Sequence, residues 1–480
     1  MQALLTMFTP DQGTTLYPRS ASDCVFRWLD CSIRQRVTVM AENSQFKPAE
    51  RVLCTGLYRA THDKHRLIHE VTLTAGDEFP CCTQCANKVR FVLVRKINDG
   101  NVLPFRPGPI LITCQENEGT QKTEVTINSL TNSDIAELLA VAAESAKQPL
   151  QKALRRASRK CFLWPDEAAA LVQEGRSLEE LPGIGPSLSR IIKRWLDDPP
   201  EVPQPPEIRK GFCTLLQAKT IVNANPTWRD NIKGDLQMHT LWSDGSASVA
   251  EMAQAAMEYG HEYIAITDHA KGLKIAGGIN EEQLEKQAEE IVQANGRMRG
   301  KKPFRVLKSI ELNLNPAGDG DMEPAALAKL DIVLGCFHSA LRKKEDQTER
   351  YLAALRNPTL QILGHPRGRI YNFRLGLTCD WRRVFDLAAE LDKAIEIDCY
   401  PDRQDISPDL LRVAAKAGCR ISLGTDSHGP TQLRFIELGL ASALTAGIKR
   451  DRILNFMTAE KLLEWVASVR EQRVEYRKVI

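Results

Sequence analysis

Five histidines in the second half of the chain stand where apolar, β-branched runs end, and three acidic residues lie in the same setting. The eight residues are His239, Asp244, His269, Glu311, His338, His365, Asp426 and His428. A single such histidine is more often structural than a ligand, but five together favour ligands. Imidazole and carboxylate groups suit zinc, manganese or iron. The sequence therefore predicts a metal centre, and so many donors could hold two or three divalent ions.

The elements that must position these side chains are the runs themselves. YIAITDH, IVLGCFH, LQILGHP and RISLGTDSH are typical of buried parallel strands, and stretches such as SVAEMAQAAMEYG have the spacing of helices. Alternating strands and helices predict an α/β barrel over residues 235–480, with the strand ends meeting at one face. The face where the strands end is where such barrels carry their chemistry.

Length and composition limit the class of protein. The 480 residues should form several domains, and the net charge of +3 gives no global attraction to nucleic acid. The thirteen cysteines are odd in number and scattered, which suits a reducing compartment. The first twenty residues lack a signal-peptide pattern, and no apolar run approaches about 18 residues. We expect a cytoplasmic protein without a membrane partner.

Residues 1–115 are expected to form a small β-rich module, with a hairpin around Asp99 and Gly100. The module also carries two pairs of residues with the spacing of zinc ligands, namely His62, His65, Cys82 and Cys85. A structural Zn²⁺ is one interpretation of these pairs. The other is that the cysteines are reduced core residues and the histidines lie at the surface.

Residues 128–199 have a helical pattern, and the stretch from Lys147 to Lys160 is basic and contains no acid. It is followed by Pro182-Gly183-Ile184-Gly185 between two helical segments. Glycines there would let the backbone approach a phosphodiester, and the next helix would present free amides. The expected DNA-binding residues are Gly183, Ile184, Gly185, Arg190, Lys193 and Arg194. The alternative is an ordinary glycine-rich connection between helices.

The proline-rich stretch PPEVPQPPE starts at Pro199, and residues 200–234 are expected to form a linker between the helices and the barrel. They include no Asp-x-Asp pair and are too few for a nucleotidyltransferase domain. Polymerase activity is therefore not expected.

Two parts of the chain resemble a known family. The helical part is similar to the helix-hairpin-helix domain of DNA polymerase beta, and DLQMHTLWSDG, ITDHA, IELNLNP, GCFHS, GHPRGR and GTDSH resemble the PHP (polymerase and histidinol phosphatase) domain in family order. The chain thus looks like a bacterial family X DNA polymerase without its polymerase core. The resemblance implies a multidomain protein with a distorted (βα)7 PHP barrel at the C-terminus, an all-α helix-hairpin-helix domain in the middle and a β-rich module at the N-terminus.

The resemblance also implies a trinuclear site of Mn²⁺ or Zn²⁺. By this analogy His239 and Asp426 serve one metal, Glu311 bridges to a second ion held by His338 and His365, and a third group completes the site. That third group is Asp244, His269 and His428. Gln237 replaces the first histidine of the HxH pair common in PHP proteins, so we expect a weakened first site. The residues expected to be catalytic are Glu311, His239, Asp426, His338 and His365.

The chemistry implied is hydrolysis of a phosphoester by metal-activated water, with Arg367 and Arg369 as the expected phosphate-binding residues, and Arg403 and Lys271 as further candidates. Three functions remain open. The first is a DNA-processing phosphoesterase, either a 3′–5′ exonuclease or a repair endonuclease, which binds DNA independently of sequence. The second is a small-molecule phosphatase resembling histidinol phosphatase. The third is a PHP domain that serves as a non-catalytic platform.

Overall fold

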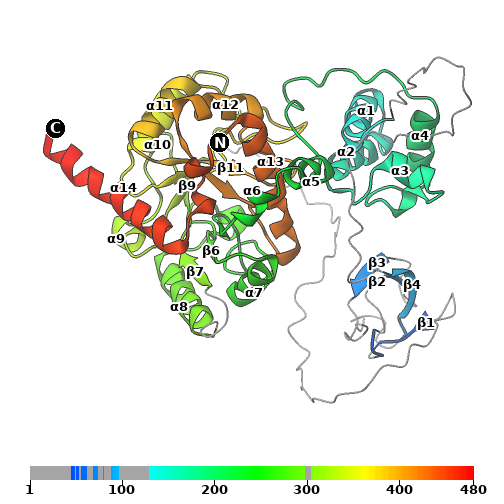
Figure 1. Cartoon of the computed structure of the whole chain (residues 1–480), viewed down its shortest axis with the longest axis horizontal. Helices are drawn as coiled ribbons and strands as arrows, with labels where there is room; N and C mark the ends of the chain where they lie inside the picture. Colours follow the sequence, from blue (N-terminus) through cyan, green and yellow to red (C-terminus); the bar gives the residue numbers. More distant parts are fainter. Residues whose placement is uncertain are drawn as a thin grey trace, which may run out of the picture. The chain divides into compact units, whose positions relative to one another are not determined.

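The computed structural model describes residues 45–48, 50–52, 56–61, 69–73, 79, 88–96, 129–297 and 304–479. The chain divides into two compact units, Met1–Thr120 and Gln121–Ile480 (Figure 1). None of the helices in the described ranges combines the length and the apolar character that crossing a membrane requires.

The described part of the first unit is a four-stranded antiparallel sheet in the order β1-β4-β2-β3. Its strands are β1 (Gln45–Phe46), β2 (Gly56–Thr61), β3 (His69–Leu73) and β4 (Arg90–Lys96). The core is aromatic: the ring centroid of Phe79 lies 5.0 Å from those of Phe46 and Tyr58 and 4.9 Å from that of Phe91. The predicted zinc ligands His62, His65, Cys82 and Cys85 and the predicted Asp99-Gly100 turn lie outside the described residues.

The second unit begins with a helical segment. Its elements are α1 (Asn132–Ser145), α2 (Leu150–Lys160), η1 (Cys161–Leu163), α3 (Ala168–Gln173), η2 (Leu178–Glu180) and α4 (Pro186–Asp197). A capping box of Thr131 and Asp134 starts α1. Apolar residues at helical spacing on each helix, including Ile135, Leu139 and Ile192, are fully buried in one shared core.

Residues 200–234 are more ordered than the expected linker. They contain α5 (Leu215–Asn223) and α6 (Pro226–Asp230), and α5 starts at a capping box of Thr214 and Gln217. Leu215, Ala218 and Val222 share one helical face, which packs into the barrel core. The segment therefore contributes to the barrel instead of only connecting it.

The barrel strands are parallel and lie in two sheets, β12-β11-β10-β9-β8 and β5-β6-β7. They are β5 (Gly234–Asp235), β6 (Tyr263–Ile266), β7 (Arg305–Lys308), β8 (Glu311–Asn313), β9 (Leu334–Cys336), β10 (Ile362–Leu363), β11 (Ala394–Asp398) and β12 (Arg420–Gly424). Parallel bridges between Met238 and Ser427 and between His269 and Glu311 connect the sheets. Since only two residues separate β7 from β8, these two form one interrupted strand. The described strands of the barrel then number seven.

Helices surround these strands (Figure 1). They are α7 (Val249–Tyr259), α8 (Glu281–Arg297), α9 (Pro324–Leu327), α10 (Thr348–Arg356), α11 (Trp381–Glu390), α12 (Pro408–Ala417) and α13 (Ile436–Ala446). Gly260 and Gly418 end α7 and α12 in the left-handed conformation, with φ of 97° and 79°, which glycine adopts without a steric penalty.

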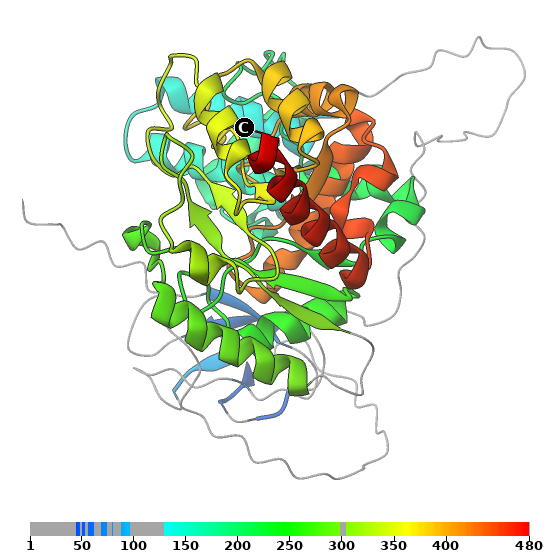
Figure 2. The same ribbon diagram turned by 90° about the vertical axis from the view of Figure 1, so that its left-hand side faces the viewer.

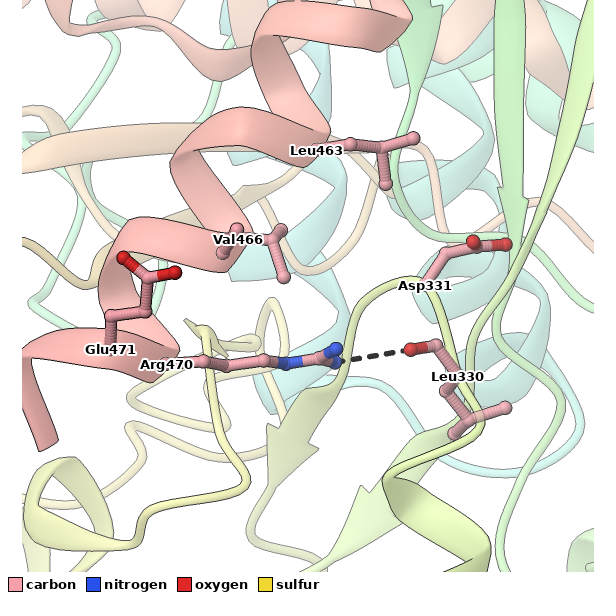
Figure 3. Close-up of a pocket in the computed structure, with 7 residues that line it drawn as sticks. Leu330, Asp331, Leu463, Val466, Arg470 and Glu471 are labelled. Carbon is pink, nitrogen blue, oxygen red and sulfur yellow. Dashed lines mark hydrogen bonds between the residues drawn. The ribbon is translucent and has the colours of Figure 1, made fainter. Parts of the chain in front are cut away.

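The end of the barrel where the strands begin is covered by α14 (Ala459–Val479), which crosses in front of the strands in Figure 2. Leu462, Trp465 and Val466 pack against residues of the strands. Arg470 donates to the carbonyl of Leu330, which precedes β9, and a cavity of about 340 Å³ lies between this loop and α14 (Figure 3). The opposite end, where the strands finish, is left for the predicted site.

The helical segment packs on loops at that opposite end. Tyr371, on the loop after β10, lies in the core of the helical segment, and its hydroxyl is 3.0 Å from that of Ser158. Arg209 forms a buried ion pair with Glu137 at 2.8 Å and also donates to Asn372 at 3.1 Å. These contacts fix the helical segment to the loop that also carries His365.

Candidate metal centre

The predicted ligands converge at the carboxyl ends of the strands. His239 follows β5, His269 follows β6, His338 follows β9, His365 follows β10, and Asp426 and His428 follow β12, while Glu311 begins β8. His365 and Asp426 have φ of 20° and 51°, a conformation uncommon outside glycine, which turns each chain sharply at its strand end. The barrel topology therefore brings together residues separated by up to 189 positions, from His239 to His428.

Glu311 lies at the centre of one group of donors and is fully buried. Its Oε1 is 2.8 Å from Nε2 of both His338 and His365. Its Oε2 is 3.3 Å from Nε2 of His239 and 3.3 Å from Nδ1 of His269. One carboxylate thus touches four imidazoles, a geometry suited to a bridging ligand.

Asp244 organises a second group. Its Oδ1 is 3.3 Å from Nε2 of His428, 3.5 Å from Nε2 of His269 and 4.0 Å from Nδ1 of His239. A third group joins His239 to Asp426, with 2.9 Å between Nε2 and Oδ1. In the described ranges, the donor atoms lie within 4.8 Å of one another, a separation that one ion can span, in four sets: His239, Asp244, His269 and His428; His269, Glu311 and His338; Glu311, Cys336 and His365; and His239, Glu311 and Asp426.

The buried donor atoms are consistent with bound cations. Within the described ranges, Nδ1 of His239, Nδ1 of His269, Nε2 of His338 and Oδ2 of Asp426 are buried and form no hydrogen bond. Such atoms are rare because each carries a desolvation cost, unless an ion or water serves them. They are four of thirteen such side-chain atoms in the described ranges, and they are the ones that belong to the predicted ligand set; their grouping around Glu311 and Asp426 fits bound divalent ions.

The electrostatics of the cluster point the same way. Burial alone would raise the pKa of Glu311, but His269 and His338 hold it well below its ordinary value. Burial would likewise lower the pKa of His239, but Asp426 and Glu311 raise it well above the ordinary value. Glu311 therefore stays ionised at the centre of the cluster, whereas burial lowers the pKa of His269 to about 4 and keeps that imidazole neutral, the form that binds a metal.

Gln237 faces the same cluster. Its side-chain NH2 is assigned toward Glu396, where it donates to both carboxylate oxygens at 2.8 and 3.0 Å. This orientation turns its Oε1 toward Oε2 of Glu311, 3.3 Å away. Two acceptor oxygens at that distance repel each other unless a cation lies between them. Gln237 is therefore placed to act as a ligand through its oxygen.

Arg403 is the arginine that lies at the centre. Its Nη1 is 3.3 Å from Oδ2 of Asp426 and 3.7 Å from Oδ2 of Asp398. Burial would lower the pKa of Arg403, but Asp426 and Asp398 raise it, so the side chain stays charged. Burial and the charge of Asp426 raise the pKa of Asp398 well above its usual range.

The two arginines expected to bind phosphate, Arg367 and Arg369, instead donate hydrogen bonds to backbone carbonyls. Arg369 is buried, and its three nitrogens donate to the backbone carbonyls of Arg403, Lys210 and Gly211. It also stacks on Phe212 at 3.8 Å. The Nε of Arg367 donates to the carbonyl of Leu377. The contacts of Arg369 therefore hold the segment of Lys210 and Gly211 against the barrel, whereas the sequence predicted that Arg369 binds phosphate. Lys271, a further candidate for binding phosphate, forms an ion pair with Glu281 at 2.7 Å.

Two further residues, Asn313 and Cys336, lie beside the predicted ligands. Oδ1 of Asn313 lies 3.1 Å from Nδ1 of His338 and orients that ring. Cys336 comes within the Glu311 and His365 group, but burial raises the pKa of its thiol well above the ordinary value. Both residues stand at strand ends and within the motifs IELNLNP and GCFHS, and these two signals in the sequence could have singled them out.

The predicted DNA-binding residues lie around α4. Gly183 has φ of 87°, Gly185 caps the helix, and Trp164 donates to the carbonyl of Pro182. Ile184 is buried in the core of the helical segment, so only its backbone could reach a ligand. The three basic residues of the prediction are exposed on the helix, namely Arg190, Lys193 and Arg194.

Comparison with known proteins agrees with this geometry. Residues 235–421 match the PHP domain. The chain is 36% identical over 225 residues to DNA polymerase/3′-5′ exonuclease PolX of Bacillus subtilis (strain 168), which covers 47% of this chain and 39% of that relative. It is 28% identical over 237 residues to a "probable phosphatase" of Thermoanaerobacter sp. (strain X514), covering 46% of this chain and 89% of the relative.

Among solved structures, the histidinol phosphate phosphatase of Lactococcus lactis aligns with 45% of this chain and 95% of its own, at 18% identity and a TM-score of 0.36. The chain spans about two fifths of the length of the Bacillus subtilis relative. The described barrel is thus a PHP domain that carries the donor set of a metal-dependent phosphoesterase.

Proposed function

We propose that this protein is a metal-dependent phosphoesterase that hydrolyses DNA as a 3′–5′ exonuclease or a repair endonuclease. The observation that carries the proposal is the convergence of eight imidazole and carboxylate donors in the same compact unit as a helical hairpin with exposed basic residues. The residues proposed as ligands include Gln237, His239 and Asp244, which follow β5, and Glu311, which begins β8.

The chain's own residues would divide the work as follows. Divalent Mn²⁺ or Zn²⁺ ions, when bound, supply a water of lowered pKa and neutralise charge on the phosphate. Glu311, between four imidazoles, holds neighbouring sites at a fixed separation. Arg403 keeps its charge beside Asp426 and is placed to stabilise negative charge that develops on a phosphate oxygen.

DNA as the substrate is supported by the helical segment. Gly183, Gly185 and the free amides at the start of α4 can approach a phosphate, and Arg190, Lys193 and Arg194 add charge. The contacts of Tyr371 and Arg209 hold this segment to the loop of a metal ligand. The name of the Bacillus subtilis relative includes a 3′-5′ exonuclease, which agrees with the proposal. We do not expect polymerase activity, because α5 and α6 are the only described helices between the hairpin and the barrel.

A small-molecule phosphatase is the second candidate, favoured by the relatives named probable phosphatase, whose length the match nearly spans. The two functions separate in one assay. Single-stranded DNA and histidinol phosphate are incubated with the full-length protein and Mn²⁺. We expect release of nucleotides and little release of phosphate from histidinol phosphate; the reverse result would establish the second candidate.

A second experiment tests the role of the hairpin. Replacing Arg190, Lys193 and Arg194 by glutamine should weaken DNA binding and reduce its dependence on salt, since each lost phosphate contact releases about one counterion fewer. Binding measured by fluorescence anisotropy at several salt concentrations gives the slope. An unchanged slope would remove these residues from the DNA interface.

A further inference from the structure

Phe373 is an exposed aromatic side chain on the loop that carries a metal ligand. The loop follows β10, begins at His365 and returns to the barrel at Leu377. Phe373 is 56% exposed, whereas Leu377, four residues later, is fully buried. The exposed part of the Phe373 side chain is therefore available for contact with a ligand.

The turn that presents Phe373 is held rigidly. Ile370 and Arg374 pair as an antiparallel bridge around it, with backbone hydrogen bonds of 2.8 and 3.0 Å. On one side Tyr371 is fixed by the carbonyl of Asp402 at 2.7 Å, and on the other Asn372 is held by Arg209 at 3.1 Å. The ring is therefore presented to solvent by a fixed backbone, which lowers the entropy cost of a contact made there.

The ring is also close to the loops of the metal centre. The guanidinium of Arg342 lies 4.6 Å from the centroid of the Phe373 ring. Arg342 comes four residues after His338, and Phe373 eight residues after His365, so the pair joins the loops that supply two imidazoles to Glu311. Arg403, beside Asp426, and Arg342 both act electrostatically on Arg374, the neighbour of Phe373.

Other exposed apolar side chains lie at the same end of the barrel. Seven large apolar residues in the described ranges are exposed, and four of them are on loops that follow barrel strands, namely Leu241, Ile275, Phe373 and Leu375. Such loops carry the metal ligands, and the backbone of Ser243 comes close to Gly277, which connects two of these loops. Apolar surface between arginines suits a ligand that alternates flat apolar groups with negative charges.

We propose that Phe373 is a stacking platform for an unstacked base of the DNA strand whose phosphodiester lies at the metal centre. This inference rests on the proposed DNA hydrolysis and adds a specificity-determining residue to it. Arg342, beside the ring, and Arg403, beside Asp426, would supply positive charge to the phosphates of the strand. Aromatic stacking of this kind tolerates any base, so the platform gives selection for nucleotides without selection for sequence.

The test compares Phe373→Ala with wild type on two substrates, a short single-stranded oligonucleotide and bis(p-nitrophenyl) phosphate, a diester without bases. We expect a KM for the oligonucleotide about tenfold higher, with kcat nearly unchanged, because stacking contributes to binding. Phe373→Trp should restore the wild-type KM. Hydrolysis of the base-free diester should be the same in all three proteins.

The matched control is Val292→Ala, which removes an exposed apolar side chain, 63% exposed, from α8. It should leave the KM for the oligonucleotide unchanged. If wild type hydrolyses the oligonucleotide and Phe373→Ala does so with the same KM, the platform is refuted while DNA hydrolysis stands. A parallel loss on the base-free diester would show a purely structural role. Absence of DNA hydrolysis by wild type would overturn both proposals.

Discussion

Glu311 is the side chain on which the metal centre most depends. It is fully buried and lies within 3.3 Å of four imidazole nitrogens, from His239, His269, His338 and His365. No other carboxylate in the described ranges contacts so many of the predicted ligands. A neutral side chain of the same shape would keep the packing but remove the charge that neighbouring cations share.

Glu311→Gln should therefore abolish hydrolysis while the protein stays folded. We expect the rate of DNA hydrolysis to fall at least about a thousandfold, or roughly 4 kcal/mol in the activation barrier. Steady-state kinetics with Mn²⁺ measures the fall, and Glu282→Gln, at an exposed position on α8, is the control. DNA binding by the helical segment should persist. A variant that keeps near wild-type activity would place the catalytic site elsewhere.

The convergence of these side chains could be predicted from sequence because their position at strand ends is a local property. His338 and Asp426, for example, each follow an apolar run, and parallel strands in a barrel finish at one face. The part played by Arg369 could not be predicted, because its partners Lys210 and Gly211 are more than 150 positions away. The orientation of Gln237 also depends on Glu396, from a strand that lies far along the chain.

One buried ion pair contributes to the contact between the helical segment and the barrel. Arg209, 5% exposed, pairs with Glu137 of α1, 8% exposed, and with the solvent-exposed Glu144. Removing one member of a buried pair leaves an uncompensated charge, whereas an exposed pair contributes little. The two acids therefore provide a matched comparison at one arginine.

Glu137→Ala is expected to destabilise the packing of α1 on Arg209 by about 3 kcal/mol, and Glu144→Ala by less than about 1 kcal/mol. Hydrogen exchange of the α1 amides, together with urea unfolding, measures the two losses. Equal losses in the two variants would mean that burial does not determine the strength of this contact.

Sequence periodicity predicted the helices and strands better than it predicted the segments that connect them. The proline-rich PPEVPQPPE predicted a linker over residues 200–234, but the stripe of Leu215, Ala218 and Val222 packs α5 into the barrel core. Nine residues of amphipathic helix are a weak pattern, and only the tertiary contact with α13 makes them stable. Sequence periodicity cannot report such a contact.

The stability of the whole barrel should depend on pH through His261, which precedes β6 and lies away from the metal centre. It is 6% exposed, and burial lowers its pKa from 6.5 to about 4. The unfolded chain takes up a proton at this histidine near pH 6.5, but the folded chain does not do so until about pH 4. Its contribution to stability is thus complete above pH 6.5 and is lost as the pH falls toward 4.

His261→Gln should remove this dependence. Between pH 7 and pH 5 the free energy of unfolding of wild type should fall by about 2 kcal/mol more than that of the variant. Urea unfolding followed by tryptophan fluorescence at both pH values gives the difference. Parallel falls in the two proteins would show that His261 is accessible to protons in the folded state.

The metal content of the full-length protein tests this account most directly. The clustered donor atoms, the buried imidazole nitrogens without a hydrogen bond and the proposed hydrolysis all point to ions at the same place. After reconstitution with Mn²⁺ and Zn²⁺ and removal of excess metal, elemental analysis should find two or three divalent ions per chain that Glu311→Gln does not retain in full. The possible zinc site in the first unit would add one ion, equally in both proteins. Less than one ion per chain in wild type, or identical metal content in wild type and Glu311→Gln, would contradict a metal centre built around Glu311.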